Sequence, residues 1–285
     1  MRPKHWLKNA LVAFALIFGR RFAFEDILII VAGIAAFCLI SSAVYILNDI
    51  FDVENDRKHE VKKNRPIAAG LVSVRFAWFL MILLFLTAIS VNIIVSIFTS
   101  AQNLSSQVGT VILLLVYFML NLGYSAKLKH IPIVDVLILS SGFLIRIFYG
   151  AWMIGQPVSD WLYLTVLALS LYMGLGKRRN ELVALDELAG ETRKVLNLYT
   201  KEFLDKNMLV CLTLTIVFYS FWTLDLENNM LVWSVPMVLT IVMRYSLLTE
   251  TKRFADPVDV LLNDKPLIIL TLLYMGLVAV FLTLS

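Results

Sequence analysis

Long apolar segments recur from one end of this chain to the other. Of its 285 residues, 60% are hydrophobic and 16% are charged, and the mean hydropathy is +0.82. About 20 consecutive apolar residues suit a helix that crosses a bilayer, and a water-soluble core could not bury this many such segments. We therefore predict an all-α integral membrane protein with about nine spans, at roughly residues 6–20, 26–47, 74–99, 108–123, 132–153, 159–176, 207–225, 229–248 and 266–284.

The basic residues are distributed unevenly over the connections between these spans. Of 25 Lys and Arg residues, 22 fall on one side, in the connections or at the adjoining span ends, Arg20 and Arg21 fall on the other, and Arg146 lies well within a span. An excess of this kind marks the cytoplasmic side of a membrane protein. We expect one catalytic domain over residues 1–285 with a cytoplasmic N-terminus and cytoplasmic loops at about 48–73, 124–131, 177–206 and 249–265.

One polar segment, NDIFDVENDRKHEVKKNRPIAAG at residues 48–70, interrupts the apolar pattern. Asn48, Asp52 and Asp56 recur at i, i+4 and i+8, so on a helix they share one face, with Asp49 beside them. Oxygen ligands on one face suit Mg²⁺, which one or two carboxylates typically hold while substrate phosphates complete its shell. Polar groups at this density beside a membrane helix are costly, which favours a functional site. The segment predicts a magnesium–diphosphate site at a membrane surface.

Basic side chains follow the acidic ones in the same segment. Lys62 and Arg65 stand before Pro66, and cationic side chains are the donors that phosphates require. They could equally be ordinary positive-inside anchors, but their proximity to the aspartates favours phosphate contacts. We interpret His59 as a residue that positions the acceptor, because a phosphate acceptor needs no general base at neutral pH.

The N-D-x-x-D-x-x-x-D pattern resembles the first aspartate motif of the UbiA superfamily of intramembrane prenyltransferases. Further segments, in order RPKHWLKN, YSAKLKHIPIVDV, SSGFLIRIFYG and GKRRNE, resemble one branch of it, the decaprenyl-phosphate phosphoribosyltransferases. The resemblance implies a bundle of nine transmembrane helices around a central cavity. It also implies transfer of 5-phosphoribose from phosphoribosyl pyrophosphate to a polyprenyl phosphate in a bacterial plasma membrane, for cell-envelope arabinan precursors.

A second aspartate motif distinguishes ordinary prenyltransferases of this superfamily, in the loop after the sixth span. Here that loop opens with Lys177, Arg178 and Arg179, and a D-x-x-x-D pattern is absent. Cationic side chains in this loop, in place of carboxylates, suit the second phosphate of a phosphosugar donor. We therefore favour the phosphoribosyl reaction. The alternatives are prenyl transfer from a prenyl diphosphate to an aromatic or quinone-precursor acceptor, and a transporter whose polar cluster gates an ion path.

These arguments define three groups of candidate site residues. The predicted cofactor is Mg²⁺, and the predicted partners are phosphoribosyl pyrophosphate, a polyprenyl phosphate and the membrane, with no nucleic acid and with a homo-oligomer left open. Arg146, within an apolar span, is interpreted as a phosphate clamp, with a structural ion pair to Asp135 as the alternative. The catalytic candidates are Asp49, Asp52 and Lys62; the metal ligands are Asn48, Asp52 and Asp56; and the substrate-binding candidates are Lys8, Tyr45, Lys58, His59, Lys62, Arg65, Tyr124, Lys127, Lys129, Arg146, Lys177 and Glu181.

Overall fold

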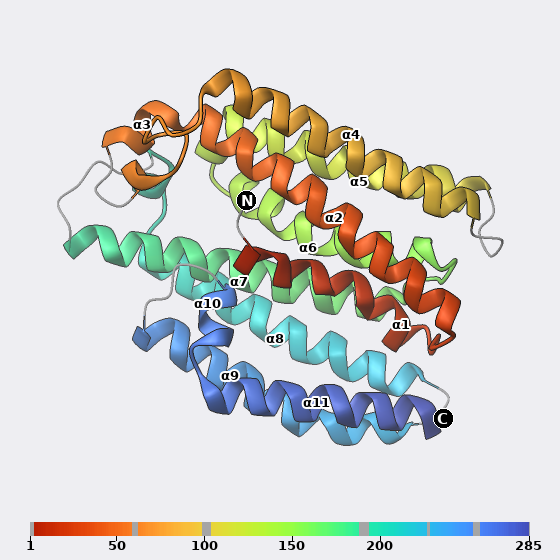
Figure 1. Ribbon diagram of the computed structural model, residues 1–285. Coiled ribbons are helices and arrows are strands. Elements are labelled where there is room, and N and C mark those ends of the chain that lie inside the picture. The colour runs from red at the N-terminus through yellow and green to blue at the C-terminus, as the bar shows by residue number, and fades with distance from the viewer. Residues whose placement is uncertain are drawn as a thin grey trace. The chain divides into compact units, whose positions relative to one another are not determined.

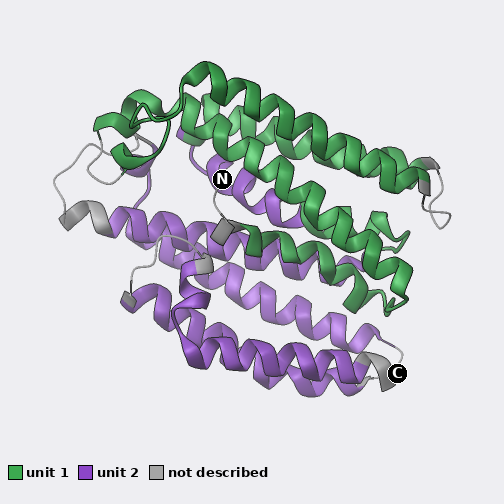
Figure 2. Cartoon of the chain, viewed as in Figure 1, with its two compact units in different colours: residues 1–129, 145–157 green, residues 130–144, 158–285 purple. Residues whose placement is uncertain are grey.

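The computed structural model describes residues 3–58, 62–98, 104–187, 194–226, 229–252 and 257–284, and every regular element within these ranges is a helix (Figure 1). The contacts group the chain into two compact units, shown in green and purple in Figure 2. Unit 1 comprises residues 1–129 and 145–157, and unit 2 comprises residues 130–144 and 158–285. The predicted all-α fold class is confirmed for the described residues.

Unit 1 is built around one long helix, α2, which packs against α4, α5 and the N-terminal 3-10 helix. The unit ends with the second half of α6, whose first half belongs to unit 2. Its elements are η1 (Pro3–Ala13), α1 (Phe14–Phe18), α2 (Phe24–Phe51), α3 (Val53–Lys58), η2 (Lys62–Asn64), α4 (Val74–Phe98), α5 (Leu104–Ala126), the start of η3 (Leu128–His130) and the later part of α6 (Val134–Met153).

Unit 2 is built around α7, which packs along α8. The later helices α9 and α11 pack against each other, and α8 also contacts α9. Besides the first half of α6, the elements are α7 (Asp160–Glu187), η4 (Lys194–Leu198), α8 (Lys201–Asp225), η5 (Asn229–Ser234), α9 (Val235–Lys252), α10 (Pro257–Leu262) and α11 (Lys265–Leu284).

Six of the described helices are long and apolar enough to cross a membrane. They correspond to six of the predicted spans, at Phe24–Phe51, Val74–Ile97, Ser105–Ala126, Val134–Met153, Lys201–Asp225 and Met230–Thr251. Two shorter apolar helices, Trp6–Phe18 and Lys265–Phe281, coincide with the first and last predicted spans. The count of nine and the central cavity stay predictions.

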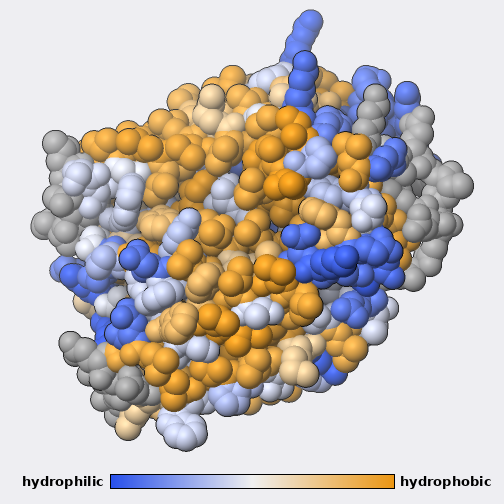
Figure 3. Space-filling model, turned by 180° about the vertical axis from the view of Figure 1, so that it is seen from behind, coloured by the Kyte–Doolittle hydropathy of each residue, from blue (hydrophilic) through white to orange (hydrophobic). Residues whose placement is uncertain are grey.

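The surface of the spanning helices is apolar, as a lipid environment requires. On α4, Phe76, Phe79, Leu86 and Ile97 are each more than half exposed. The face in Figure 3 is accordingly mostly hydrophobic. Exposed side chains of this size would be unfavourable in water, whereas lipid tails accommodate them without cost. The long apolar segments therefore face lipid as well as one another.

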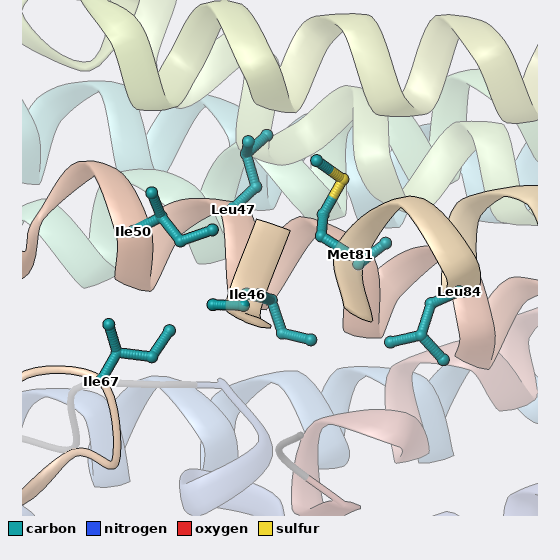
Figure 4. Packing of buried hydrophobic residues seen from close by; sticks show 8 residues of the cluster. Ile46, Leu47, Ile50, Ile67, Met81 and Leu84 are labelled. Atoms are coloured by element: carbon teal, nitrogen blue, oxygen red, sulfur yellow. The ribbon is translucent and has the colours of Figure 1, made fainter. Parts of the chain in front are cut away.

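The cluster of buried residues between α2 and α4 also fixes the polar segment that follows α2. Ile46 and Ile50 of α2 pack with Met81 of α4, and Ile67 from the connection joins the same cluster (Figure 4). Burying a side chain such as Ile67 contributes about 1.5–3 kcal/mol. The connection between α2 and α4 is thus attached to the helix ends by its own apolar residue.

The segment predicted as a cytoplasmic loop at about 177–206 begins as a continuation of α7. Helix α7 continues through Lys177 to Glu187 without interruption. Arg178 pairs with Glu181 one turn later, and such a pair stabilises a helix. The next described element is η4, and α8 begins after Thr200, whose hydroxyl accepts a hydrogen bond from the Phe203 amide at 3.1 Å.

Candidate functional site

The acidic motif lies where α2 passes into α3, at one end of unit 1 (Figure 1). Asp52 is the C-cap of α2, yet the chain continues as α3 from the next residue. The Asp52 amide donates to the Asn48 carbonyl at 3.0 Å, and the Asp56 amide donates to the Asp52 carbonyl at 2.8 Å. Two successive i to i+4 hydrogen bonds therefore join Asn48, Asp52 and Asp56, as the spacing predicted.

A tight turn after η2 brings Arg65 to this motif. The Ala69 amide donates to the Arg65 carbonyl at 2.8 Å, and Gly70 has a φ of +76°, a conformation that glycine adopts without strain. Ile67 and Ala68 are buried, and the Arg57 Nε contacts the Ala68 carbonyl at 3.4 Å. The turn is thus held from both of its sides, which limits where the Arg65 side chain can lie.

The guanidinium of Arg65 bridges two of the motif's carboxylates. Its Nη1 lies 3.1 Å from Oδ1 of Asp49 and 2.6 Å from Oδ2 of Asp56. The Asp56 side chain is only 5% exposed, so its charge depends on this partner. Arg65 thus reduces the repulsion between two carboxylates, and it attaches the turn to both α2 and α3.

Ser125 in the last turn of α5 and Lys129 in η3, which follows α5, are the partners of the two remaining motif residues. Nζ of Lys129 contacts Oδ1 of Asp52, and the Ser125 hydroxyl donates to Oδ1 of Asn48. The Asp52 side chain is 28% exposed, more than either carboxylate held by Arg65. Of the predicted basic residues, Arg65 and Lys129 are therefore the two whose contacts with the acidic motif are established.

The donor set fits a hard divalent cation in its chemistry. The predicted ligands Asn48, Asp52 and Asp56 offer an amide oxygen and two carboxylates on successive turns, with Asp49 beside them, which is the ligand type that Mg²⁺ prefers. Within the described ranges, however, no three His, Cys, Asp or Glu side chains converge as a metal cluster. The carboxylates are instead paired with Arg65 and Lys129. The oxygen ligands are present, but most of their charge is offset from within the chain.

The other predicted residues of unit 1 lie at different depths around these helix ends. Lys58 and Lys127 are exposed, and the side chain of neither forms a hydrogen bond or ion pair with another residue that the structure describes. Their roles as phosphate contacts stay predictions, and His59 lies outside the described residues. Four candidates are buried or half-buried and engage in further contacts: Lys8, Tyr45, Lys62 and Tyr124.

Arg146 is enclosed within unit 1. Its Nε donates to Oδ1 of Asn9 at 2.8 Å, and its Nη2 donates to the Tyr117 hydroxyl at 3.1 Å. Its guanidinium also lies 4.8 Å from the ring centroid of Phe37 and 5.0 Å from that of Tyr117, distances typical of cation–π contacts. These contacts join η1, α2 and α5 around one cation. Arg146 is only 5% exposed. Its predicted role as a phosphate clamp stays a prediction.

Asp135, the alternative partner considered for Arg146, forms an ion pair with Arg178 in unit 2. Both side chains are fully buried, and Arg178 also contacts Glu181. The Tyr199 hydroxyl donates a hydrogen bond to Oδ1 of Asp135 at 2.7 Å and accepts one from the Ile133 amide at 2.6 Å. Burial, and then Asp135, raises the pKa of Tyr199 to about 12, so this hydroxyl stays a donor. Arg178 is therefore a buried structural cation, not an open phosphate ligand.

The three basic residues at the end of α7 thus differ in their surroundings. Arg178 is neutralised by Asp135 and Glu181, and Arg179 forms an ion pair with Asp205. The side chain of the half-buried Lys177 forms no hydrogen bond or ion pair with another described residue. Glu181 was predicted to orient Lys177 or to bind a ribose hydroxyl, and its established partner is Arg178. Lys177 is the one of the three whose charge is not balanced within the described chain.

Sequence reasoning missed several residues that hold the predicted ones in place. Ser125 follows Tyr124 directly, and Asn9 follows Lys8, so both lie inside motifs that the sequence singled out. Tyr117 and Tyr199 have no such signal, because an aromatic residue in an apolar helix or at a helix start is common. Their roles depend on which elements pack together, and this is not encoded locally.

Comparison with known proteins decides the family. Residues 9–260 match the UbiA prenyltransferase family. The chain belongs to this family. A UbiA homolog from Archaeoglobus fulgidus, solved with DMAPP and Mg²⁺, superimposes with a TM-score of 0.71 at 17% identity over 100% of this chain and 98% of its own. A homolog from Aeropyrum pernix has a TM-score of 0.66 at 15% identity over 100% and 98% of the two chains. These structures show that the UbiA fold is shared. The long apolar helices and the membership of the UbiA family indicate a multi-pass membrane protein.

Two relatives confirm the resemblance to one branch of the family. The decaprenyl-phosphate phosphoribosyltransferase of Corynebacterium glutamicum is 34% identical, over 95% of this chain and 82% of its own length. Its counterpart from Mycobacterium tuberculosis is 31% identical, over 98% and 91%. By contrast, the digeranylgeranylglyceryl phosphate synthase of Saccharolobus solfataricus is 32% identical over only 39% of this chain. The sequence similarity to the phosphoribosyltransferases therefore extends over nearly the whole UbiA chain.

Proposed function

We propose that this UbiA-family protein transfers 5-phosphoribose from phosphoribosyl pyrophosphate to a polyprenyl phosphate and releases pyrophosphate. The observation that carries the proposal is the similarity to decaprenyl-phosphate phosphoribosyltransferases over at least 95% of the chain. The basic end of α7 supports it, since Lys177 offers an unbalanced cation where an acidic motif would serve a second metal set. The product would be a precursor of cell-envelope arabinan.

The acidic end of unit 1 is the proposed diphosphate end of the donor site. Asn48 and Asp52 would hold Mg²⁺, which, when bound, screens the charge of the pyrophosphate and makes it a better leaving group. Asp49 supports this set from the adjacent position on α2. Lys62 and Lys129 would contact pyrophosphate oxygens directly, because ammonium groups form charge-assisted hydrogen bonds with phosphates.

In the proposed reaction the bond between the anomeric carbon and the pyrophosphate oxygen breaks, and its electron pair leaves with pyrophosphate. A phosphate oxygen of the lipid acceptor forms the new bond to the same carbon. The acceptor is already an anion at neutral pH, so the chain needs no general base. Its residues act by holding two anions in contact against their mutual repulsion, with electrostatic stabilisation of the departing pyrophosphate.

The substrates also define the orientation that we propose. The donor is a water-soluble phosphosugar, and the acceptor keeps its polyprenyl tail among lipids. The basic connections identified from the sequence face the cytoplasm in this proposal, so the charged end of α2 meets the donor there. Such a surface would also attract anionic substrates before they bind.

The decisive assay combines purified protein in detergent, Mg²⁺, radiolabelled phosphoribosyl pyrophosphate and a polyprenyl phosphate. We expect a labelled lipid product and an equal amount of pyrophosphate. A parallel reaction replaces these substrates with a prenyl diphosphate and an aromatic acid. Product from the parallel reaction alone would contradict the proposal and support the aromatic prenyltransferase alternative.

A further inference from the structure

The two basic residues that neutralise the acidic motif do so in different ways. Arg65 joins two carboxylates at once, including the buried Asp56. Lys129 contacts a single oxygen of Asp52, and that carboxylate is the most exposed of the three. A guanidinium is a rigid fork suited to bridging, whereas an ammonium on a flexible stem is a mobile point charge. The Arg65 bridge is thus the more firmly held of the two.

The charge of this cluster changes sign when a divalent cation is added. The three carboxylates and the two basic groups together carry one net negative charge. One divalent ion turns this into one net positive charge, which attracts a diphosphate. A divalent ion on the Asp52 carboxylate would lie next to the Lys129 ammonium on Oδ1, and two cations this close repel each other. Binding of a cation to Asp52 therefore favours the departure of Lys129, while the Arg65 bridge needs no change.

We propose that Lys129 is an internal counter-ion that leaves Asp52 when Mg²⁺ binds and then contacts the diphosphate, while Arg65 remains on Asp49 and Asp56. This deepens the proposed function, because it assumes a magnesium–diphosphate site at the end of α2. It makes Asp52, not Asp56, the exchangeable ligand. In the absence of metal, the Lys129 contact keeps the carboxylate neutralised and lowers its affinity for stray cations.

The test measures binding of Mg²⁺ alone to the full chain in detergent by calorimetry, without any substrate. K129Q removes the competing ammonium and should bind Mg²⁺ about three- to tenfold more tightly than the wild type, as expected for losing a partly exposed ion pair. The matched control is Lys63→Met, which removes one positive charge from an exposed site in η2. Equal gains in Mg²⁺ affinity in K129Q and K63M, or no gain in K129Q, would overturn the proposed exchange of Lys129 for Mg²⁺ on Asp52.

Two further measurements distinguish the exchange of Lys129 for Mg²⁺ from a general effect of removing one positive charge. With Mg²⁺ saturating, K129Q should bind inorganic pyrophosphate about tenfold more weakly, since a charge-assisted hydrogen bond is lost. Arg65→Gln should lower the thermal midpoint in the absence of Mg²⁺ more than K129Q does, because it leaves the buried Asp56 without its partner. Unchanged pyrophosphate affinity in K129Q, or an unchanged thermal midpoint in R65Q, would contradict the division of roles.

These binding measurements use only Mg²⁺ and inorganic pyrophosphate, so their results do not depend on which group the enzyme transfers. If the protein used a prenyl diphosphate donor, the proposed function would fail while the gain in Mg²⁺ affinity of K129Q still supported the exchange. If labelled phosphoribosyl lipid formed while K129Q bound Mg²⁺ like the wild type, the function would stand and the exchange would be wrong.

Discussion

The ammonium of Lys129 contacts the carboxylate of Asp52, although 77 positions separate the two residues in the sequence. The contact arises because α5, which ends just before Lys129, packs against α2, which ends at the residue before Asp52. Ser125, one turn earlier, reaches Asn48 in the same way. The ends of two membrane helices thereby form one polar site.

Replacing Asp52 by Asn should abolish most of the phosphoribosyl transfer while the protein stays folded. D52N keeps the shape of the side chain but removes the charge proposed to hold Mg²⁺, so we expect a loss of about 100-fold or more in kcat/KM. The thermal midpoint should change little, because a partly exposed ion pair contributes about 1 kcal/mol or less. The control is Glu54→Gln, an exposed residue on α3. Activity of D52N within about threefold of the wild type would exclude Asp52 from the metal site.

Replacing Arg178 by Met should destabilise the fold strongly. The substitution leaves the carboxylate of Asp135 buried without its cation, which costs about 3–5 kcal/mol in free energy of unfolding. The neighbouring Arg179→Met is the control and should cost about 1 kcal/mol or less, because its partner Asp205 is substantially exposed. In a double-mutant cycle, R178M with Asp135→Asn should cost less than the sum of the single changes. Strictly additive effects would show that the buried pair is not coupled.

The Tyr199 hydroxyl should make stability depend on pH at the alkaline end. Its raised pKa of about 12 means that the folded protein keeps a proton that the unfolded chain loses near pH 10. The contribution of the protonated Tyr199 hydroxyl to the stability of the folded protein is complete below about pH 10 and is lost as pH rises through about 12. We expect Tyr199→Phe to cost about 1–3 kcal/mol at pH 8, and the difference from the wild type to shrink by pH 11. A difference that is constant across this range would contradict the role of Tyr199 as a donor to Asp135.

Substitution by alanine should have opposite effects on stability at Gly150 and at Gly276. A Cβ at Gly150 would lie 2.1 Å from the Val12 carbonyl oxygen, whereas a Cβ at Gly276 meets nothing within 4 Å. Gly150→Ala should therefore push η1 away from α6 and cost at least about 2 kcal/mol in free energy of unfolding. Gly276→Ala should be neutral or stabilising by up to about 1 kcal/mol, because alanine restricts the unfolded chain. Thermal unfolding in detergent measures both, and an unperturbed G150A would show that η1 does not approach α6 this closely.

The sequence by itself determined the properties that depend on neighbouring residues. Membrane spans follow from runs of apolar side chains, and six predicted spans correspond to described helices of sufficient length. The shared face of Asn48, Asp52 and Asp56 follows from helical periodicity, and the backbone hydrogen bonds through this stretch are those of a helix. Quoted motifs were also enough to indicate the family.

Only the tertiary structure decided which charges balance one another. From the sequence, Arg65 and Lys129 were candidate phosphate contacts, and Arg178 was one of the cations in place of a second acidic motif. In the fold, Arg65 bridges Asp49 and Asp56, Lys129 neutralises Asp52, and Arg178 is buried with the distant Asp135. The physical reason is that an ion pair depends on distance in space and on exclusion of water, and both are set by helix packing between segments that the local sequence does not specify.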